Sequence, residues 1–268
     1  MLKLRSRLFG LFAVIWSVGF ALPGLTIRLL PDNPARVRRI SRIWARGVLW
    51  GLRVIVGLTH RIERPDPSAG APRLLAVNHQ SAWETIAFAV IEPDVCFIAK
   101  SDLKRIPLFG WYLERSPMIF IEREARGRNL RRLLGETEAA LAAGRPVMIF
   151  PEGTRRAPFE RARLERGVAL LYERLNLPVT PVTHDSGLYL WSGFGAKHPG
   201  EIRVAYHPPI PAGLSRAAFI ERLEAALLDG KDALATERLG EPGIRDRLGE
   251  KAPTPHAEDA SPDPSPQG

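Results

Sequence analysis

The stretch LLAVNHQSAWETIAF, from Leu74 to Phe88, joins two different structural patterns. Its first four residues are apolar, which is typical of a strand buried on both faces of a parallel sheet. Its second half has the apolar content of a buried helix. Between them stands Asn-His-Gln-Ser, and because Asn78 is a good helix N-cap, we expect His79 at or near the first helical turn. The stretch therefore predicts a strand–loop–helix unit with a histidine at the strand's end.

Short apolar runs alternate with helical patterns along the rest of the chain. Helices are predicted over 125–144, 165–176 and 215–230, with Gly144 as the C-cap of the first. The strand candidates are 73–77, 95–99, 118–122, 146–150, 178–182 and 201–206. This alternation predicts an α/β domain with a mixed, largely parallel central sheet flanked by helices.

Polar or charged residues follow four successive strand candidates. They are Asn78-His79, Lys100, Arg123 and the cluster Pro151–Arg155. In α/β sheets, ligands bind in the crevice beyond the carboxyl ends of the strands. We therefore expect these four clusters to belong to one shared site.

His79 and Glu84 are the favoured acid–base pair of that site. In a regular helix, a spacing of five residues would place them about 140° apart. Contact therefore requires that His79 lies at an irregular helix start and that its ring folds back. The carboxylate would then fix one ring nitrogen as a donor and leave the other to accept a proton. The alternative is a surface turn that contains a histidine by chance.

Two other arrangements are weaker candidates. Ser81 could be a hydrolase nucleophile, but a spacing of two positions from His79 does not favour contact, and no G-x-S-x-G elbow precedes a helix here. His184 and Asp185 also follow a strand candidate, yet adjacent side chains of an extended chain point apart.

The cluster FPEGTR offers groups for an acceptor molecule. Glu152 can accept a hydrogen bond from a hydroxyl, and Gly153 lets backbone amides approach a ligand. Arg155 can hold a phosphate or pair with Glu152, and Lys100 would act as a mobile point charge. A strand-to-turn connection with a surface ion pair is the alternative.

Composition limits the partners. The net charge of +9 points to a polyanion, and we expect no nucleic acid, because the chain has no helix-turn-helix, RNP-type or zinc-finger pattern. The expected partner is therefore an anionic membrane surface or a phosphorylated substrate. The histidines outside the first stretch have no ligand spacing, so no metal is expected. The single cysteine, Cys96, excludes an intramolecular disulfide.

The first 60 residues are typical of a membrane-anchoring segment. Residues 8–27 carry no charge and would rise about 30 Å as one helix, but Pro23-Gly24 interrupts them. Basic residues flank both sides, so an interfacial or re-entrant insertion is favoured as much as a crossing. Residues 37–58 form a basic amphipathic pattern with tryptophans, suited to an anionic interface. Packing on the soluble core and a cleavable signal peptide are the alternatives.

The predicted organisation has three parts. Residues 1–60 are the membrane-anchoring helices, 61–235 the catalytic domain and 236–268 a disordered tail. The tail is richest in Pro, Ser, Asp and Ala from Gly249 onward.

Four blocks, in this order and at these separations, resemble the glycerolipid acyltransferase family. They are NHQSAWE (78–84), MIFIER (118–123), FPEGTR (150–155) and LPVTPV (177–182). Within that family the chain is most similar to bacterial 1-acyl-sn-glycerol-3-phosphate acyltransferases, over about residues 70–210. Two positions differ: the first block usually ends in Asp, where this chain has Glu84, and the second commonly opens with Gly, where it has Pro117.

The resemblance implies a role for each matching residue. His79 would be the catalytic base and Glu84 its orienting acid. The acceptor would be bound by Lys100, Arg123, Glu152, Gly153, Thr154 and Arg155, and Pro181 matches the proline of the fourth block.

The implied reaction moves an acyl chain from acyl-CoA or acyl-carrier protein to the sn-2 hydroxyl of 1-acyl-sn-glycerol-3-phosphate and gives phosphatidate. No cofactor is expected beyond this co-substrate. The expected place is the cytoplasmic face of the inner membrane. The alternatives are another lysolipid acceptor such as lyso-ornithine lipid, a thioesterase-like hydrolase, and a peripheral membrane-binding protein without catalysis.

Overall fold

Seven strands of the described chain form one central sheet. The computed structural model describes residues 1–27, 33–64, 73–105, 109–121, 128–190 and 195–248. The strands are β1 (Leu58–Arg64), β2 (Leu74–Val77), β3 (Cys96–Lys100), β4 (Ile119–Ile121), β5 (Val147–Ile149), β6 (Val179–His184) and β7 (Gly200–Tyr206). The α-helices are α1 (Leu2–Ile27), α2 (Pro34–Gly51), α3 (Trp83–Ile91), α4 (Phe109–Arg115), α5 (Arg128–Ala142), α6 (Arg166–Leu175), α7 (Arg216–Glu224), α8 (Gly230–Thr236) and α9 (Ile244–Leu248).

The strand order is β1-β7-β6-β2-β5-β3-β4, and only β6 and β7 pair antiparallel among the described strands. The mixed, largely parallel sheet is thus confirmed, and each of the six predicted strands is present. Strand β1 was missed, because its polar sequence LTHRIER follows directly on the amphipathic pattern of the preceding helix. The order places β2 between β6 and β5, so the chain after β2 lies beside the ends of both neighbours.

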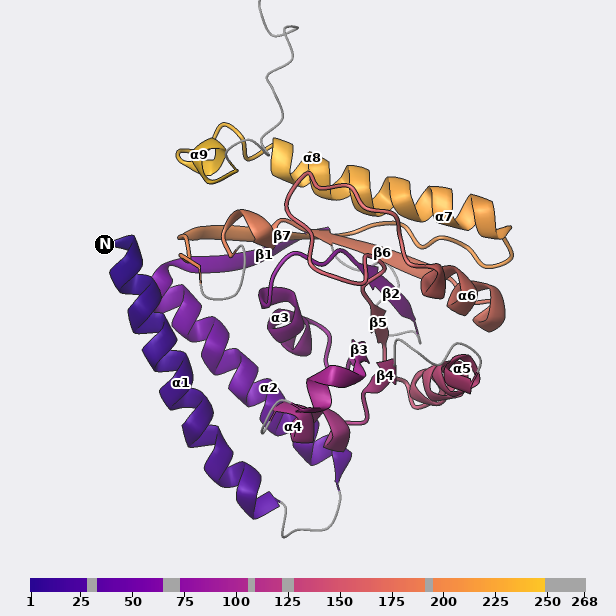
Figure 1. The fold of residues 1–268 in the computed structure, drawn as a ribbon, viewed down its shortest axis with the longest axis horizontal. Coiled ribbons are helices and arrows are strands. Elements are labelled where there is room, and N and C mark those ends of the chain that lie inside the picture. The colour runs from indigo at the N-terminus through magenta and orange to yellow at the C-terminus, as the bar shows by residue number, and fades with distance from the viewer. Residues whose placement is uncertain (28–32, 65–72, 106–108, 122–127, 191–194, 249–268) are drawn as a thin grey trace, which may run out of the picture.

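Helices cover both faces of the sheet (Figure 1). Along β2, Leu75 and Val77 join the core under α1, α2 and α3, whereas Leu74 and Ala76 join the core under α5, α6 and α7. Because both faces are buried, every residue of β2 is apolar, as expected for a central parallel strand.

The N-terminal helices lie side by side, and α2 packs against α3 (Figure 1). Helix α1 continues through Pro23 and Gly24 to Ile27, so the predicted interruption is wrong. Phe9 of α1 and Val48 of α2 belong to the same core as β2. Helices α1 and α2 therefore share a core with the sheet, and this agrees with the alternative that the second segment packs on the core. Among the described residues, no helix combines the length and apolar character needed to cross a bilayer.

The predicted start of the tail at residue 236 is too early. Leu239, Ile244 and Leu248 are buried against the same core as α3, and α9 lies within this region. The Pro- and Ser-rich residues 249–268 lie outside the described residues.

Candidate functional site

The loop after β2 differs from the prediction at its first residue. Asn78 does not cap α3, which begins at Trp83 with Ala82 at its N-cap position. Instead, the side-chain amide of Asn78 makes two hydrogen bonds with the backbone of His184, each 2.9 Å long. Nδ2 donates to the His184 carbonyl, and Oδ1 accepts from the His184 N–H. Because His184 ends β6, this buried amide ties the ends of two neighbouring strands together, and residues 79–82 form an irregular loop.

The His79 ring folds back onto the first turn of α3. Its Nδ1 atom lies 2.7 Å from Oε1 of Glu84, so the pair predicted from spacing is in contact. One face of the ring stacks on Phe150, with the ring centroids 4.4 Å apart. Nε2 has no hydrogen-bond partner among the described residues, and the side chain is 15% exposed. With Nδ1–H donating to the carboxylate, the lone pair of Nε2 is the free site for a proton.

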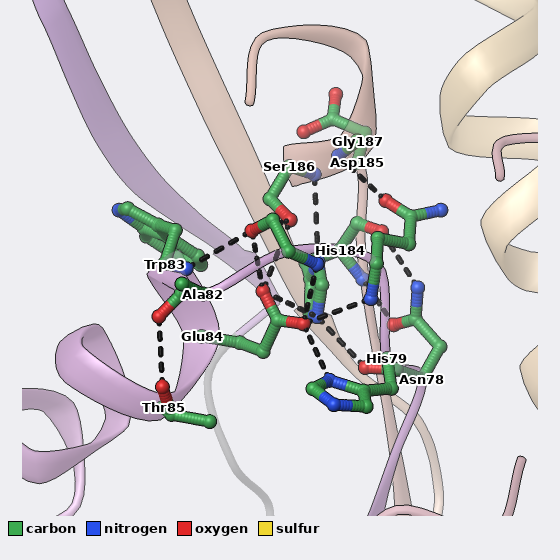
Figure 2. A network of polar contacts seen from close by, with 12 residues as sticks. Asn78, His79, Ala82, Trp83, Glu84, Thr85, His184, Asp185, Ser186 and Gly187 are labelled. Atoms are coloured by element: carbon green, nitrogen blue, oxygen red, sulfur yellow. Dashed lines mark hydrogen bonds and ion pairs between the residues drawn. The ribbon is translucent and has the colours of Figure 1, made fainter. Parts of the chain in front are cut away.

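Glu84 is fully buried and receives several hydrogen bonds (Figure 2). The amides of Gln80 and Ser81 donate to Oε1 at 2.8 and 2.7 Å. The Ser81 hydroxyl donates to Oε2 at 2.7 Å, and the Ser186 hydroxyl donates to it at 3.2 Å. Burial alone would raise its pKa, but the nearby rings of His184 and His79 and the Ser81 hydroxyl lower the pKa of Glu84 to about 2. The carboxylate is therefore ionised and fixed in place.

The Ser81 hydroxyl is part of the hydrogen-bond network around Glu84. It contacts Glu84, Ser186 and the amide of Trp83. Because these contacts hold it behind the carboxylate, the hydroxyl is not placed as a nucleophile activated by His79.

His184 and Asp185 point to different neighbours. Nε2 of His184 donates to the carbonyl of Asn78 at 2.8 Å, and Nδ1 accepts from the Ser186 amide. Burial lowers the pKa of His184, so it is a neutral ring fixed in one tautomer. Asp185 accepts from the Arg203 amide and from Arg238. These two residues therefore do not form the rival acid–base pair.

The FPEGTR turn holds the backbone of His79 from both sides. Oε2 of Glu152 accepts the His79 amide at 2.7 Å, and the Arg156 amide donates to the His79 carbonyl at 2.8 Å. Gly153 has φ +66°, and a Cβ there would lie 2.8 Å from Cγ of Glu165. Only glycine fits this position without strain.

Glu152 has a position unlike the one expected for an acceptor ligand. Its side chain is fully buried, and Oε1 pairs with Nζ of Lys231 at 3.0 Å. Since Oε2 holds the His79 amide, both oxygens already have protein partners. Its contact with the acceptor stays a prediction, whereas its contact with His79 is direct.

Lys231 is the site residue that sequence reasoning missed. It lies at the start of α8, 79 residues after Glu152, and it is fully buried. One signal could have revealed it: Lys231 stands four residues after Leu227 and three before Leu234, on the apolar side of the helical pattern. A lysine at such a position needs a buried partner.

Three of the expected acceptor ligands, Lys100, Thr154 and Arg155, are among the described residues. Lys100 ends β3, whose neighbour is β5, and it is partly exposed. Thr154 and Arg155 are exposed on the turn after β5. Arg123 lies outside the described residues, shortly after Ile121, the residue of β4 that pairs in register with Lys100. The binding roles of these residues stay predictions.

This arrangement supports general base catalysis without a covalent intermediate. A histidine whose tautomer is set by a buried carboxylate can take a proton from a hydroxyl at its free nitrogen. Among the described residues, no serine hydroxyl or cysteine thiol is bonded to the ring as a nucleophile.

The chain is similar to proteins of one enzyme class. The sequence model of the Acyltransferase family matches residues 54–185. A 1-acyl-sn-glycerol-3-phosphate acyltransferase of Pseudomonas aeruginosa is 30% identical over 78% of this chain and 81% of its own length. A lyso-ornithine lipid O-acyltransferase of Rhizobium meliloti is 36% identical over 56% of this chain and 48% of its own length.

A solved structure has the same fold. The crystal structure of the 1-acyl-sn-glycerophosphate (LPA) acyltransferase of Thermotoga maritima superposes with a TM-score of 0.68 and covers 87% of this chain and 98% of its own, at 21% identity.

Proposed function

Because this chain belongs to the acyltransferase family and is an acyltransferase, we propose that its acceptor is 1-acyl-sn-glycerol-3-phosphate and its product phosphatidate. The donor is the thioester of acyl-CoA or acyl-carrier protein. The observation that carries the mechanism is the 2.7 Å contact between Nδ1 of His79 and Glu84, which leaves Nε2 for the acceptor hydroxyl.

In the proposed reaction, Nε2 of His79 takes the proton of the sn-2 hydroxyl as its oxygen attacks the thioester carbonyl. The new C–O bond forms, and the C–S bond then breaks. The leaving thiolate takes the proton back from the imidazolium and departs as a free thiol. Glu84 stabilises the imidazolium while it exists, because its carboxylate is ionised and in direct contact with Nδ1.

The cations nearby fit the phosphate of the acceptor. Arg155 is exposed after β5, and Lys100 is the last residue of the neighbouring strand β3. With Arg123, they would fix the phosphate and so hold the hydroxyl within about 3 Å of Nε2. Arg155→Ala is expected to raise the KM for the acceptor more than it lowers kcat.

A second acceptor has support from one relative. The lyso-ornithine lipid O-acyltransferase is 36% identical over its matched part. Its acceptor would use the same base and thioester chemistry but would offer no phosphate to Arg155. A direct comparison of acceptors therefore separates the two proposals.

Membrane attachment through α1 is also part of the proposal. Exposed apolar residues repeat along one side of this helix, at Leu4, Leu8, Leu11, Ile15 and Val18, with exposures of 49–63%. Phe9, Phe12 and Trp16 on the other side pack inward. The apolar stripe would enter the bilayer, and the exposed Lys3, Arg5 and Arg7 beside it would contact anionic headgroups. The membrane surface proposed is the cytoplasmic face of the inner membrane.

The test is an assay of the purified full chain. Each donor class is combined with lysophosphatidate and with lyso-ornithine lipid, and products are identified by mass spectrometry. We expect phosphatidate, and a loss of at least about 100-fold in kcat for His79→Ala. His198→Ala, which changes a partly exposed histidine on the loop before β7, is the control. Retention of most activity by His79→Ala would refute the base assignment, and product from lyso-ornithine lipid alone would reassign the acceptor.

A further inference from the structure

A buried chain of contacts links the C-terminal helices to the proposed base. Nζ of Lys231 contacts Oε1 of Glu152 at 3.0 Å, and Oε2 of Glu152 accepts the His79 amide at 2.7 Å. We propose that Lys231 is a positioning residue for His79, acting through Glu152. This inference rests on the proposed role of His79, and it assigns a function to a residue outside the matched span 54–185.

The burial of the pair makes each partner depend on the other. Both side chains are 0% exposed. Removal of one partner from a buried ion pair leaves an uncompensated charge, which is strongly destabilising. Glu152 therefore keeps its two-sided arrangement only while Lys231 is present.

The helix that carries Lys231 is itself fixed close to the sheet. A Cβ at Gly230 would lie 2.9 Å from the His207 ring and 3.1 Å from Thr183 of β6, so a larger residue would push the helix outward. Nζ of Lys231 also donates to the carbonyl of Glu160 at 2.7 Å. With two acceptors at fixed places, the ammonium group has a defined position.

The consequence for His79 is geometric. With Oε1 of Glu152 held by the ammonium, the carboxylate cannot turn, and Oε2 stays aimed at the His79 amide. The Arg156 amide holds the His79 carbonyl from the other side. The peptide groups on both sides of the histidine are thus fixed, and with them the direction of Nε2. A displacement of about 1 Å at a reacting group can cost about 100-fold in rate.

The first experiment compares two single variants of the full-length enzyme. Lys231→Met is expected to lower kcat about 10- to 100-fold, with KM for both substrates within about twofold. Arg161→Met is the matched control, because Arg161 pairs with Asp229 and Asp232 on the same helical segment at the surface. It should keep wild-type kcat. Wild-type kcat in folded Lys231→Met would overturn the proposal.

The second experiment separates positioning from stability. Glu152→Gln/Lys231→Met and Glu152→Met/Lys231→Met both remove the buried charges, but only the first keeps an oxygen that can accept the His79 amide. The glutamine variant should exceed the methionine variant about tenfold in kcat, measured on protein shown to be folded by its thermal transition. Equal kcat values would overturn the proposal. The glutamine variant also replaces Lys231→Met if that single variant does not fold.

The outcomes distinguish this inference from the proposed function. If His79→Ala retains activity, the base assignment fails, whatever Lys231 does. If His79→Ala is inactive while the Lys231 variants keep wild-type kcat, only the positioning role fails.

Discussion

Nε2 of His184 lies 4.0 Å from Oε2 of Glu84, yet His184 gives its proton to the carbonyl of Asn78. Because burial lowers the pKa of His184, the contact joins a neutral ring and a carboxylate. The negative charge of Glu84 is therefore left for the other histidine, His79, when that ring becomes protonated. The two histidines beside this carboxylate thus differ: both ring nitrogens of His184 have protein partners, whereas Nε2 of His79 has none among the described residues.

Glu84→Asp is expected to lower kcat, although aspartate is the usual residue at this position of the first block in the glycerolipid acyltransferase family. The carboxylate would retract by about 1.5 Å, one C–C bond. It would then lose either the His79 ring or the amides of Gln80 and Ser81, which now converge on it at 2.7–2.8 Å. We expect a fall of about 10-fold or more in kcat, with substrate KM values little changed. A variant as active as wild type would mean that the loop adjusts freely.

The low pKa of Glu84 predicts a pH-dependent stability. Its pKa falls from 4.5 to about 2 on folding, so between these values the unfolded state binds more protons. The contribution to the free energy of unfolding is present above pH 4.5 and is lost as pH falls toward 2. Urea unfolding of wild type and Glu84→Gln at pH 7, 5, 4 and 3 should show a stability difference that shrinks only below about pH 4.5. A difference independent of pH would contradict this.

His184 variants test whether this residue acts in catalysis or in structure. His184→Gln can still donate to the carbonyl of Asn78, whereas His184→Leu leaves that buried oxygen without its donor. The leucine variant should be about 1–3 kcal/mol less stable than the glutamine variant. Both should keep kcat within about tenfold of wild type. Complete inactivity of folded His184→Gln would reopen its catalytic role.

Gly153→Ala is expected to disturb the turn that holds His79. The residue has φ +66°, and its Cβ would contact Glu165. A left-handed conformation costs about 1–2 kcal/mol for a residue with a Cβ. We expect a lower melting temperature and a lower kcat. Gly135→Ala is the control, because open space surrounds that position on α5. It should leave activity unchanged.

Substitution of the exposed stripe of α1 should release the protein from membranes. Leu8→Ser/Leu11→Ser/Ile15→Ser removes three of its apolar side chains, each 49–63% exposed. Each apolar side chain that enters a bilayer contributes about 1.5–3 kcal/mol. Co-sedimentation with vesicles of phosphatidylglycerol and phosphatidylcholine should fall strongly, while the melting temperature stays near wild type. Binding that persists unchanged would place the contact elsewhere.

The parts of the site that follow from local pattern were predictable. His79 could be placed at a strand end because four apolar residues precede it, and its contact with Glu84 followed once an irregular loop was assumed. The role of Asn78 could not be predicted, since its partner His184 lies 106 residues later. Lys231 left only the weak signal of a lysine on an apolar face. Long-range partners of this kind depend on the sheet order, which single-sequence patterns do not specify.

The place of Lys231 near the end of the fold also sets an order of events during synthesis. Helix α1 leaves the ribosome about 200 residues before Lys231, which at about 5–20 residues per second is about 10–40 s. For most of that time, β2 and the His79–Glu84 loop exist without the helix that completes them. The part of the protein suited to a lipid surface is thus made well before the helix whose lysine completes the proposed catalytic centre.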